Sequence, residues 1–389
     1  MSNKIRVSKQ NFDEDLFIKS EKLRVNNKSI KTPIKSFDMK KLRRDTEISS
    51  DVKGANEIFR KFTVDEIKDF MVGKKDEKII GKTINTSINK TSCDELNFCF
   101  ILVDDNKLPD GKEIDFITNI GYIYSDATPL PLVKALFKDG ANGMDDFDKY
   151  IDFMSKSIES INRLNNKPIL GIIPSRMPSS FIEDLVLFYH DNNITSFVFD
   201  FDGKGHSGVD SNIRELMISI NKLDISNESF TYSCNTVIGK PSKGSNVTKA
   251  NDILVYNFGF DIMGDNHIGL KLPKKVVDAI NKRSNNSRIR LFNSDDYGHY
   301  KHDDLNSARK MYPSNETNIP FEVFEGDNKT KMDNSQRLFN SERIGLELVK
   351  YRQFINENES TFKYLETKYQ IKDDLGKLKK FKSDLKLSN

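Results

Sequence analysis

Cysteine is scarce in this sequence, and long apolar runs are missing. Cys93, Cys99 and Cys234 are the only cysteines in 389 residues, and no two of them form a CxxC pair. This pattern excludes a disulfide framework and a structural zinc site of the usual spacing, and it indicates a reducing compartment. No stretch approaches the roughly 18 apolar residues of a membrane span, and the first residues lack an apolar signal-peptide core. We therefore expect a soluble, cytoplasmic protein with no membrane partner.

A large excess of charge of one sign is also missing. Lysine and arginine total 61, aspartate and glutamate total 58, and the net charge is +3. The electrostatic field of the whole molecule is therefore weak, and a polyanion would have to be held by a local patch. The length fits either one α/β barrel or two ordinary domains.

Short apolar runs alternate with longer amphipathic segments along most of the chain. Runs of strand length lie at 97–103, 117–126, 168–174, 194–203, 229–236 and 252–260. Segments with helical spacing lie at 55–72, 147–164, 179–193 and 212–223. The first of these helical segments contains Thr63 and Glu66 at capping-box spacing. Before them, the Asn-Asn pair within 22–34 predicts a β-hairpin. This serial alternation predicts a parallel sheet.

Acidic residues follow several of the predicted strands. They are Asp104, Asp105, Asp126, Asp200, Asp202, Asp261 and Asp265. In a barrel of parallel strands all such ends lie on one face, which carries the chemistry. A Rossmann fold would need a Gly-rich phosphate loop after its first strand, and none is present. We therefore predict an α/β fold with a TIM-type (β/α)8 barrel at 51–310. A polar segment with a β-hairpin precedes it at 1–50, and a loop with basic C-terminal helices follows at 311–389.

Five stretches of the chain resemble the motifs of one enzyme family, in the same order. They read "LRVNNKSIKTP", "FTVDEIKDF", "IGYIYSDATPLP", "KPILGIIPS" and "NFGFDIMGDNH". These stretches resemble the N-terminal hairpin, the LTPEEL helix and three strands of the tRNA-guanine transglycosylases. The resemblance implies an α/β barrel that exchanges guanine in nucleic acid for a 7-deazaguanine base. The substrate would be tRNA or, as in the family's DNA-modifying paralogues, DNA.

The chain departs from this family at several positions. The family's CxCxxC zinc motif is absent, since no cysteine follows Cys234, and we therefore expect no zinc and no other cofactor. The glutamine of the family's base-recognition strand appears here as Pro174. The nucleophile motif is one residue longer, so that Asp265 rather than Gly264 is taken as the match. Family members commonly pair, which makes a homodimer or a heteromer an expectation.

Retention of configuration at a nucleoside C1′ needs a carboxylate nucleophile and a second carboxyl group as acid and base, roughly 5 Å apart. By resemblance Asp265 would be the nucleophile, and Asp104 or Asp105 would be the acid and base. Asp126, also by resemblance, would bind the N1/N2 edge of the purine.

Four further residues would complete the substrate site. Asp202 and Gly203 lie on the loop that matches the family's Gly-rich loop, and Asp202 would add an acceptor. Tyr124 and Phe260 would stack on a base that has left its own stack, a step costing a few kcal/mol. Each candidate also has an alternative interpretation as a purely structural residue, because aspartates favour caps and turns and buried aromatic side chains favour the core.

Two other classes of function remain open. The first is a non-catalytic paralogue that binds nucleic acid or a catalytic subunit, which the lost zinc motif favours. The second is an unrelated barrel enzyme for a small phosphorylated or sugar substrate, with a phosphate nest at 237–246. A separate pair, His299 and His302, has a spacing that would suit a metal if both lay on one helix face, and otherwise belongs to a polar loop.

Overall fold

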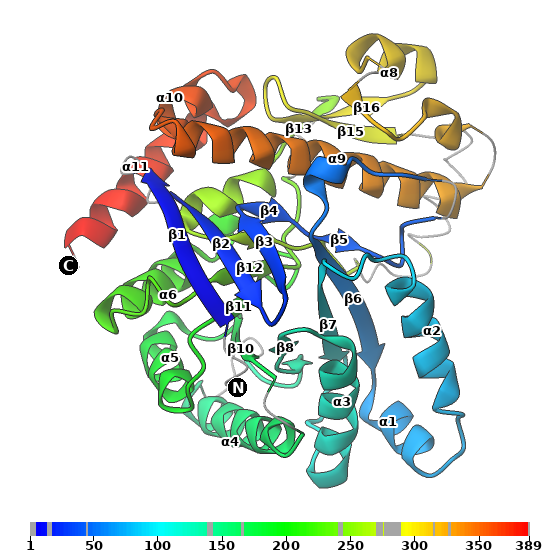
Figure 1. The fold of residues 1–389 in the computed structure, drawn as a ribbon, viewed down its shortest axis with the longest axis vertical. Coiled ribbons are helices and arrows are strands. Elements are labelled where there is room, and N and C mark those ends of the chain that lie inside the picture. Colours follow the sequence, from blue (N-terminus) through cyan, green and yellow to red (C-terminus); the bar gives the residue numbers. More distant parts are fainter. Residues whose placement is uncertain are drawn as a thin grey trace.

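Parallel strands and the helices that connect them form most of the molecule (Figure 1). The computed structural model describes residues 5–13, 18–43, 46–137, 143–164, 167–239, 244–269, 275, 289–313, 316–325 and 328–387. Six strands form one parallel sheet in the order β4, β14, β12, β11, β10, β8. Four strands form a second parallel sheet in the order β5, β6, β7, β9. The predicted α/β class with a parallel sheet is confirmed.

The two parallel sheets are joined at both of their edges. Only Ser36 separates β4 from β5, and only Leu130 and Pro131 separate β8 from β9. The combined sheet is therefore curled. The strands of the first sheet are β4 (Ile34–Lys35), β8 (Thr128–Pro129), β10 (Ile169–Pro174), β11 (Phe197–Asp200), β12 (Thr231–Cys234) and β14 (Ile262–Met263). Those of the second are β5 (Phe37–Asp38), β6 (Ala55–Phe62), β7 (Leu96–Val103) and β9 (Leu132–Val133).

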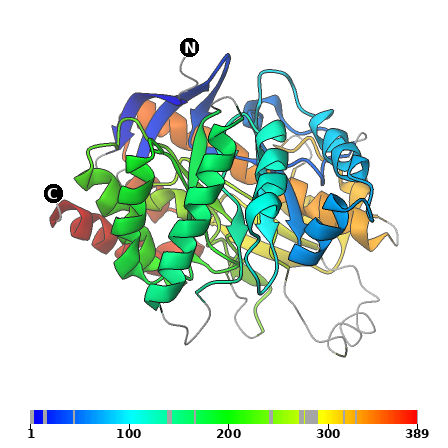
Figure 2. The same cartoon turned by 90° about the horizontal axis from the view of Figure 1, so that it is seen from below.

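Helices cover the outer face of the curled sheet, and the cyan and green helices of Figure 2 lie on this face. They are α1 (Val64–Met71), α2 (Lys78–Ile88), α3 (Gly111–Tyr124), α4 (Gly143–Asn162), α5 (Ile182–Asp191) and α6 (Asp210–Lys222). The capping box at the start of α1 is confirmed. The Thr63 hydroxyl accepts a bond of 3.1 Å from the Glu66 amide, and the Glu66 carboxylate accepts one of 3.0 Å from the Thr63 amide.

Three segments differ from their predicted structure. Residues 55–62 form strand β6 rather than the first half of a helix, and 117–124 belong to helix α3 rather than to a strand. Residues 253–258 form the 3-10 helix η4 (Ile253–Phe258), so the strand before Asp265 is only β14. Of the three, only η4 is buried at every position. Continuous apolar runs of this kind do not distinguish a helix from a strand by their period.

An antiparallel sheet from the start of the chain confirms the predicted hairpin. It consists of β1 (Ile5–Asp13), β2 (Ile18–Val25) and β3 (Lys28–Thr32). The turn between β2 and β3 places Asn26 at a φ of 54°, a left-handed conformation that asparagine tolerates. Lys28 forms an ion pair of 2.8 Å with Asp126. Asp126 also accepts a bond of 2.8 Å from the amide of Asn97, near the start of β7. The hairpin therefore lies at the amino ends of the parallel strands.

A buried acidic pair lies under this hairpin. Glu21 is fully buried, and Lys19 lies 2.9 Å from its carboxylate and 3.8 Å from that of Asp261. Burial raises the pKa of Glu21, the Asp261 charge raises it too, Lys19 opposes both effects, and the resulting pKa is about 8. A carboxyl whose pKa is raised by folding stabilises the protein fully below its unfolded pKa. That contribution is lost as the pH rises through the folded pKa.

We therefore expect Glu21→Gln to stabilise the protein above about pH 8 and to change its stability little near pH 5. The gain in the free energy of unfolding at the higher pH should reach about 2 kcal/mol, because each unit of pKa shift corresponds to about 1.4 kcal/mol and Lys19 remains nearby. Urea denaturation at the two pH values measures it. Glu228→Gln, an exposed change of the same kind, should show no such difference. A Glu21→Gln gain that is equal at both pH values would contradict the prediction.

Within the described residues, the last part of the chain adds a small sheet and the helices α8 to α11. The strands β13 (Val247–Lys249), β16 (Gly298–His302) and β15 (Ile289–Asn293) are antiparallel, in this order. The helices are α8 (Leu305–Met311), α9 (Lys329–Asn356), α10 (Thr361–Glu366) and α11 (Lys372–Leu387). The shorter 3-10 helices are η1 (Ser50–Val52), η2 (Ser179–Phe181), η3 (His206–Gly208), η6 (Phe321–Phe324) and η7 (Tyr369–Ile371). Of the helices in the described ranges, none is long and apolar enough to cross a membrane.

Helix α9 lies between the small sheet and the strands β4 and β5 (Figure 1). It approaches η1 closely at Gly345, where an added Cβ would lie 2.9 Å from the side chain of Val52. Asn340 accepts a bond of 2.8 Å from the amide of Phe292 and donates one of 3.0 Å to the carbonyl of Arg290. These two bonds supply hydrogen-bond partners for two backbone groups of β15. The helix is therefore fixed against both sheets, and it covers the carboxyl ends of neighbouring parallel strands.

Candidate functional site

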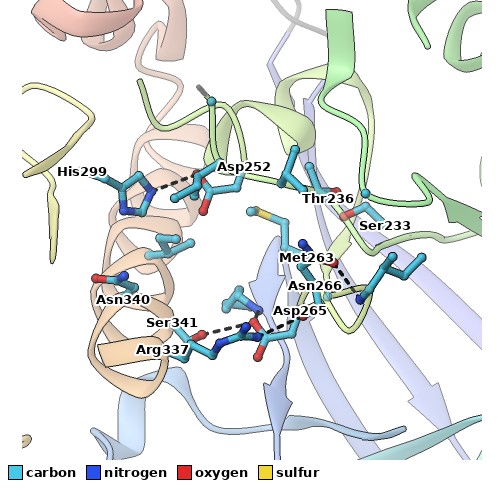
Figure 3. A pocket seen from close by; sticks show the side chains of 18 of the residues that line it. Ser233, Thr236, Asp252, Met263, Asp265, Asn266, His299, Arg337, Asn340 and Ser341 are labelled. Carbon is cyan, nitrogen blue, oxygen red and sulfur yellow. Dashed lines mark hydrogen bonds and ion pairs between the residues drawn. The ribbon is translucent and has the colours of Figure 1, made fainter. Parts of the chain in front are cut away.

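A cavity of about 650 Å³ lies at the carboxyl ends of the parallel strands, with α9 and β16 closing its other sides (Figure 3). Six of its polar side chains end or follow strands β4, β11, β12 and β14, at the carboxyl ends of the parallel strands. Its charged side chains are Lys35, Lys41, Asp202, Asp252, Asp265 and Arg337. Neutral polar side chains from α9 and the strand ends complete the wall.

Asp265 is the most extensively bonded of the predicted site residues. It lies two residues after the end of β14, lines the cavity, and has 13% of its side chain exposed. Lys35 donates to one carboxylate oxygen at 2.7 Å, and Lys41 donates to the other at 3.1 Å. The Ser341 hydroxyl of α9 lies 3.3 Å from the first oxygen. The prediction that Asp265 would lie at the carboxyl end of the sheet agrees with this position.

The two lysines keep Asp265 ionised. Burial raises the pKa of the Asp265 carboxyl, but the charges of Lys35, Lys41 and His267 lower it more, and the pKa lies well below its ordinary value. Burial in turn lowers the pKa of Lys41, but Asp265 and Asp38 raise it more. At neutral pH the site therefore holds a carboxylate between two ammonium groups.

A fully buried glutamate positions the loop that carries Asp265. Glu57, on β6, accepts bonds from the Asp265 amide at 2.9 Å and from the Tyr232 hydroxyl at 2.5 Å. The His267 Nε2 lies 2.8 Å from the same carboxylate, and the His267 ring stacks on Phe59 at 4.1 Å. The sequence analysis missed Glu57 because it placed residues 55–62 in a helix. The alternation of a strand would have directed this side chain inward.

Helix α9 also contributes to this loop. Arg337 donates a bond of 3.1 Å to the Asn266 carbonyl, and Ser341 contacts Asp265, so one face of the helix holds two consecutive residues of the loop after β14. Figure 3 shows both side chains directed from the helix toward the loop. No pattern in the sequence indicated these contacts, because they join segments more than 70 residues apart.

The two aspartates predicted as acid and base, Asp104 and Asp105, line a neighbouring hollow of about 510 Å³. Asp104 lies 3.6 Å from Lys134 in this hollow. Asp105 accepts bonds from the amides of Val64 at 2.9 Å and Asn106 at 2.6 Å, and these bonds lower its pKa. Asp105 is therefore a capping residue for the start of α1.

The hollow and the main cavity are adjacent, since Ile268 and Gly269 line both. Asp202 and Gly203 line the main cavity, as predicted for the loop after β11. Asp202 pairs there with Arg176, which lines the hollow. The structure therefore brings Asp202, Gly203 and Asp265 together, with Asp104 next to them.

Three predicted substrate-binding residues lie elsewhere. Asp126 precedes β8 and pairs with Lys28 at the amino ends of the strands, opposite the end that carries Asp265, so its predicted role in base binding is wrong. Tyr124 ends helix α3 rather than a strand, and it does not line the cavity. Phe260 is 2% exposed and packs on the rings of Phe199 and Phe201 in the core, where no base could stack on it.

The alternative sites of the sequence analysis also have defined positions. His299 and His302 lie on strand β16, where an odd spacing places side chains on opposite faces. Within the described residues no group of three or more potential metal-ligating side chains gathers at one point. In the loop at 237–246, the Gly239 amide donates to the Lys249 carbonyl at 3.1 Å. Lys240 and Lys243 lie outside the described residues.

The comparisons with known proteins add no family assignment. The sequence matches no protein-family model, and no curated protein has significant similarity to it. The geometry of the cavity and the charges around Asp265 are therefore the basis for assigning a function.

Proposed function

We propose that the curled parallel sheet is a closed (β/α)8 barrel. The segments 34–38 and 128–133 each contribute a strand to both sheets, so they count as two barrel strands. With β6, β7, β10, β11, β12 and β14 they give eight parallel strands, and each edge of one sheet continues into an edge of the other. The cavity then occupies the carboxyl face, where barrel enzymes carry their active sites.

We propose further that the protein is a transglycosylase-like enzyme that exchanges guanine for a 7-deazaguanine base in nucleic acid. The observation that carries this proposal is an ionised carboxylate, Asp265, in a cavity large enough for a nucleoside at the carboxyl face. Ionised carboxylates are the nucleophiles of retaining glycosyl transfer. Asp265 would attack C1′ and displace guanine, and the incoming base would then displace Asp265 with retained configuration.

Charges around Asp265 suit this role. The cation-rich wall of Lys35, Lys41 and Arg337 would lie near the phosphates that flank the reacting nucleoside. With Asp126 at the far end of the strands, Asp202 and the Gly203 backbone are the cavity groups that would bind the polar edge of the base. Tyr124 and Phe260 take no part in this proposal.

A single assay tests the proposal. Purified protein is incubated with radiolabelled guanine and either bulk tRNA or duplex DNA, and incorporation into the polymer is measured. We expect label in one of the two polymers and a denaturation-resistant protein–nucleic acid adduct. Binding of nucleic acid without label or adduct would instead support a non-catalytic paralogue.

One observation favours that second function. Both oxygens of Asp265 are engaged by lysines, at 2.7 and 3.1 Å, as in a structural ion pair. In a non-catalytic protein these three charges would simply hold segment 34–41 against the loop after β14. Nucleic acid would then bind without any covalent step.

A further inference from the structure

A histidine–aspartate pair forms a separate wall of the cavity that contains Asp265. His299, on β16, is 1% exposed and lines the cavity, as does Asp252, which precedes η4. The His299 Nε2 lies 3.1 Å from the Asp252 carboxylate. Figure 3 shows this pair across the cavity from the loop of Asp265 and Asn266.

The other ring nitrogen of His299 has no partner. Among the described residues, Nδ1 is buried and forms no hydrogen bond. A buried polar atom without a partner costs about 1–3 kcal/mol, and native proteins rarely retain one unless it serves a ligand or a reaction. The Phe292 ring packs beside the imidazole, with 5.4 Å between the two ring centroids.

The geometry of this pair is that of an oriented acid–base group. A carboxylate that accepts a bond from Nε2–H fixes the tautomer, so that Nδ1 is the nitrogen that takes up and releases a proton. Asp252 also lines the cavity and has 18% of its side chain exposed. The arrangement therefore supplies proton transfer within the same cavity as the nucleophile.

The two aspartates predicted for proton transfer are placed less well. Asp105 caps α1, and Asp104 faces the neighbouring hollow beside Lys134. Neither residue lines the cavity of Asp265, whereas His299 does.

We infer that His299 is the catalytic residue that transfers the proton to the departing base and removes it from the incoming base, with Asp252 as its positioning residue. This inference rests on the proposed function. For the first half His299 starts as an imidazolium, with Nε2–H bonded to Asp252 and a second proton on Nδ1. When Asp265 bonds to C1′, the C1′–N bond breaks and its electron pair goes to the base nitrogen, which takes the proton from His299 Nδ1 and leaves a neutral imidazole. In the second half the incoming base gives an N–H proton to His299 Nδ1. Its nitrogen then bonds to C1′, and the Asp265 carboxylate leaves.

The first test measures exchange. His299→Gln should lower guanine incorporation by about 100-fold or more, the usual contribution of a general acid–base group. His302→Gln, a control on the same strand but on its other face, should leave incorporation unchanged. Exchange by His299→Gln at the rate of the unmodified protein would overturn the inference and leave the proposed function intact.

The second test uses the unmodified protein and does not depend on activity. Selective 15N labelling of the five histidines reports the protonation of each ring nitrogen during titration with guanine. The Nδ1 signal of His299 should move on binding while that of His302 stays. In a separate variant, Asp252→Asn should shift the His299 tautomer away from Nε2–H and weaken the response of Nδ1 to guanine, and a partner that does not position His299 for the base would leave that response unchanged.

The exchange assay and the 15N titration together distinguish a failure of the proposed base exchange from a failure of the role inferred for His299. If the protein neither incorporates guanine nor forms the nucleic acid adduct, but its His299 Nδ1 signal responds to guanine, the proposed function is refuted and contact between His299 and the base is supported. A His299 signal that does not change at saturating guanine overturns the inference, whatever the exchange assay gives.

Discussion

Asp265→Asn is expected to abolish the covalent adduct and to lower base exchange by at least about 10³-fold, because the amide cannot attack C1′. The same change leaves Lys35 and Lys41 with an uncharged partner in a largely buried site. We expect it to lower the free energy of unfolding by about 3 kcal/mol, since removing one partner of a buried ion pair exposes the other to its full desolvation penalty. Adduct trapping and urea denaturation measure the two effects.

Two further variants separate chemistry from folding. Asp265→Glu keeps the charge and the lysine pairing but moves the carboxylate by one methylene, so it should remain folded and still lose the adduct. Asp126→Asn makes the same chemical change at the far ends of the strands, beside Lys28. It should leave exchange unchanged and cost less than about 1 kcal/mol. Normal exchange by Asp265→Glu together with Asp265→Asn would show that Asp265 is only structural.

Gly264→Ala is expected to destabilise the protein and to displace Asp265 together. A Cβ at position 264 would lie 2.6 Å from the Ser233 carbonyl oxygen and 2.9 Å from a Tyr232 ring carbon, and it would also collide with the Glu57 carboxylate. None of these groups can move freely, because Glu57 is fully buried and holds three bonds. Overpacking of this kind costs about 3 kcal/mol.

The same substitution should also change the geometry of the cavity around Asp265. The loop after β14 would have to move away from Glu57, and Asp265 would lose its amide bond to that residue. We expect a drop in thermal stability together with loss of exchange. Gly205→Ala, where no atom lies within 4 Å of the added Cβ, is the matched control and should change neither. A Gly264→Ala variant with unchanged stability would mean that the backbone does not pass this close to Glu57.

Local patterns in the sequence predicted much of the fold. The turn at Asn26, the Thr63 capping box and the fully buried strand β7 depend on neighbouring residues or on a simple period, and all three are confirmed. The position of Asp265 was predicted because it follows a short apolar strand, β14, in a serial pattern of strands and helices.

The misplaced residues have a common cause. Asp126 was assigned to the carboxyl face because residues 117–124 seemed to form a strand that ended before it. Those residues form helix α3, whose buried side chains repeat every three or four positions, so Asp126 begins the next strand instead. Because residues 117–124 were predicted as a strand and not as a helix, Asp126 was expected at the end of the sheet opposite to the one where it lies.

The partners of Asp265 could not be predicted because they come from distant segments. Glu57 lies about as deep in the core as the apolar residues around it, and only the three-dimensional arrangement shows that it faces the loop after β14. Ser341 and Arg337 reach the same loop from a helix that no local pattern connects to it.

The position of helix α9 late in the sequence determines the order in which the parts of the Asp265 site form during synthesis. A ribosome releases the amino-terminal part of a chain first, so Lys35 and Lys41 emerge long before the segment that supplies Ser341 and Arg337. Contacts across such long separations are closed late, because loop-closure entropy must be overcome first. A nascent chain that ends before α9 would therefore display two cationic side chains without their complete surroundings, and chaperones would meet this face of the protein before any substrate does.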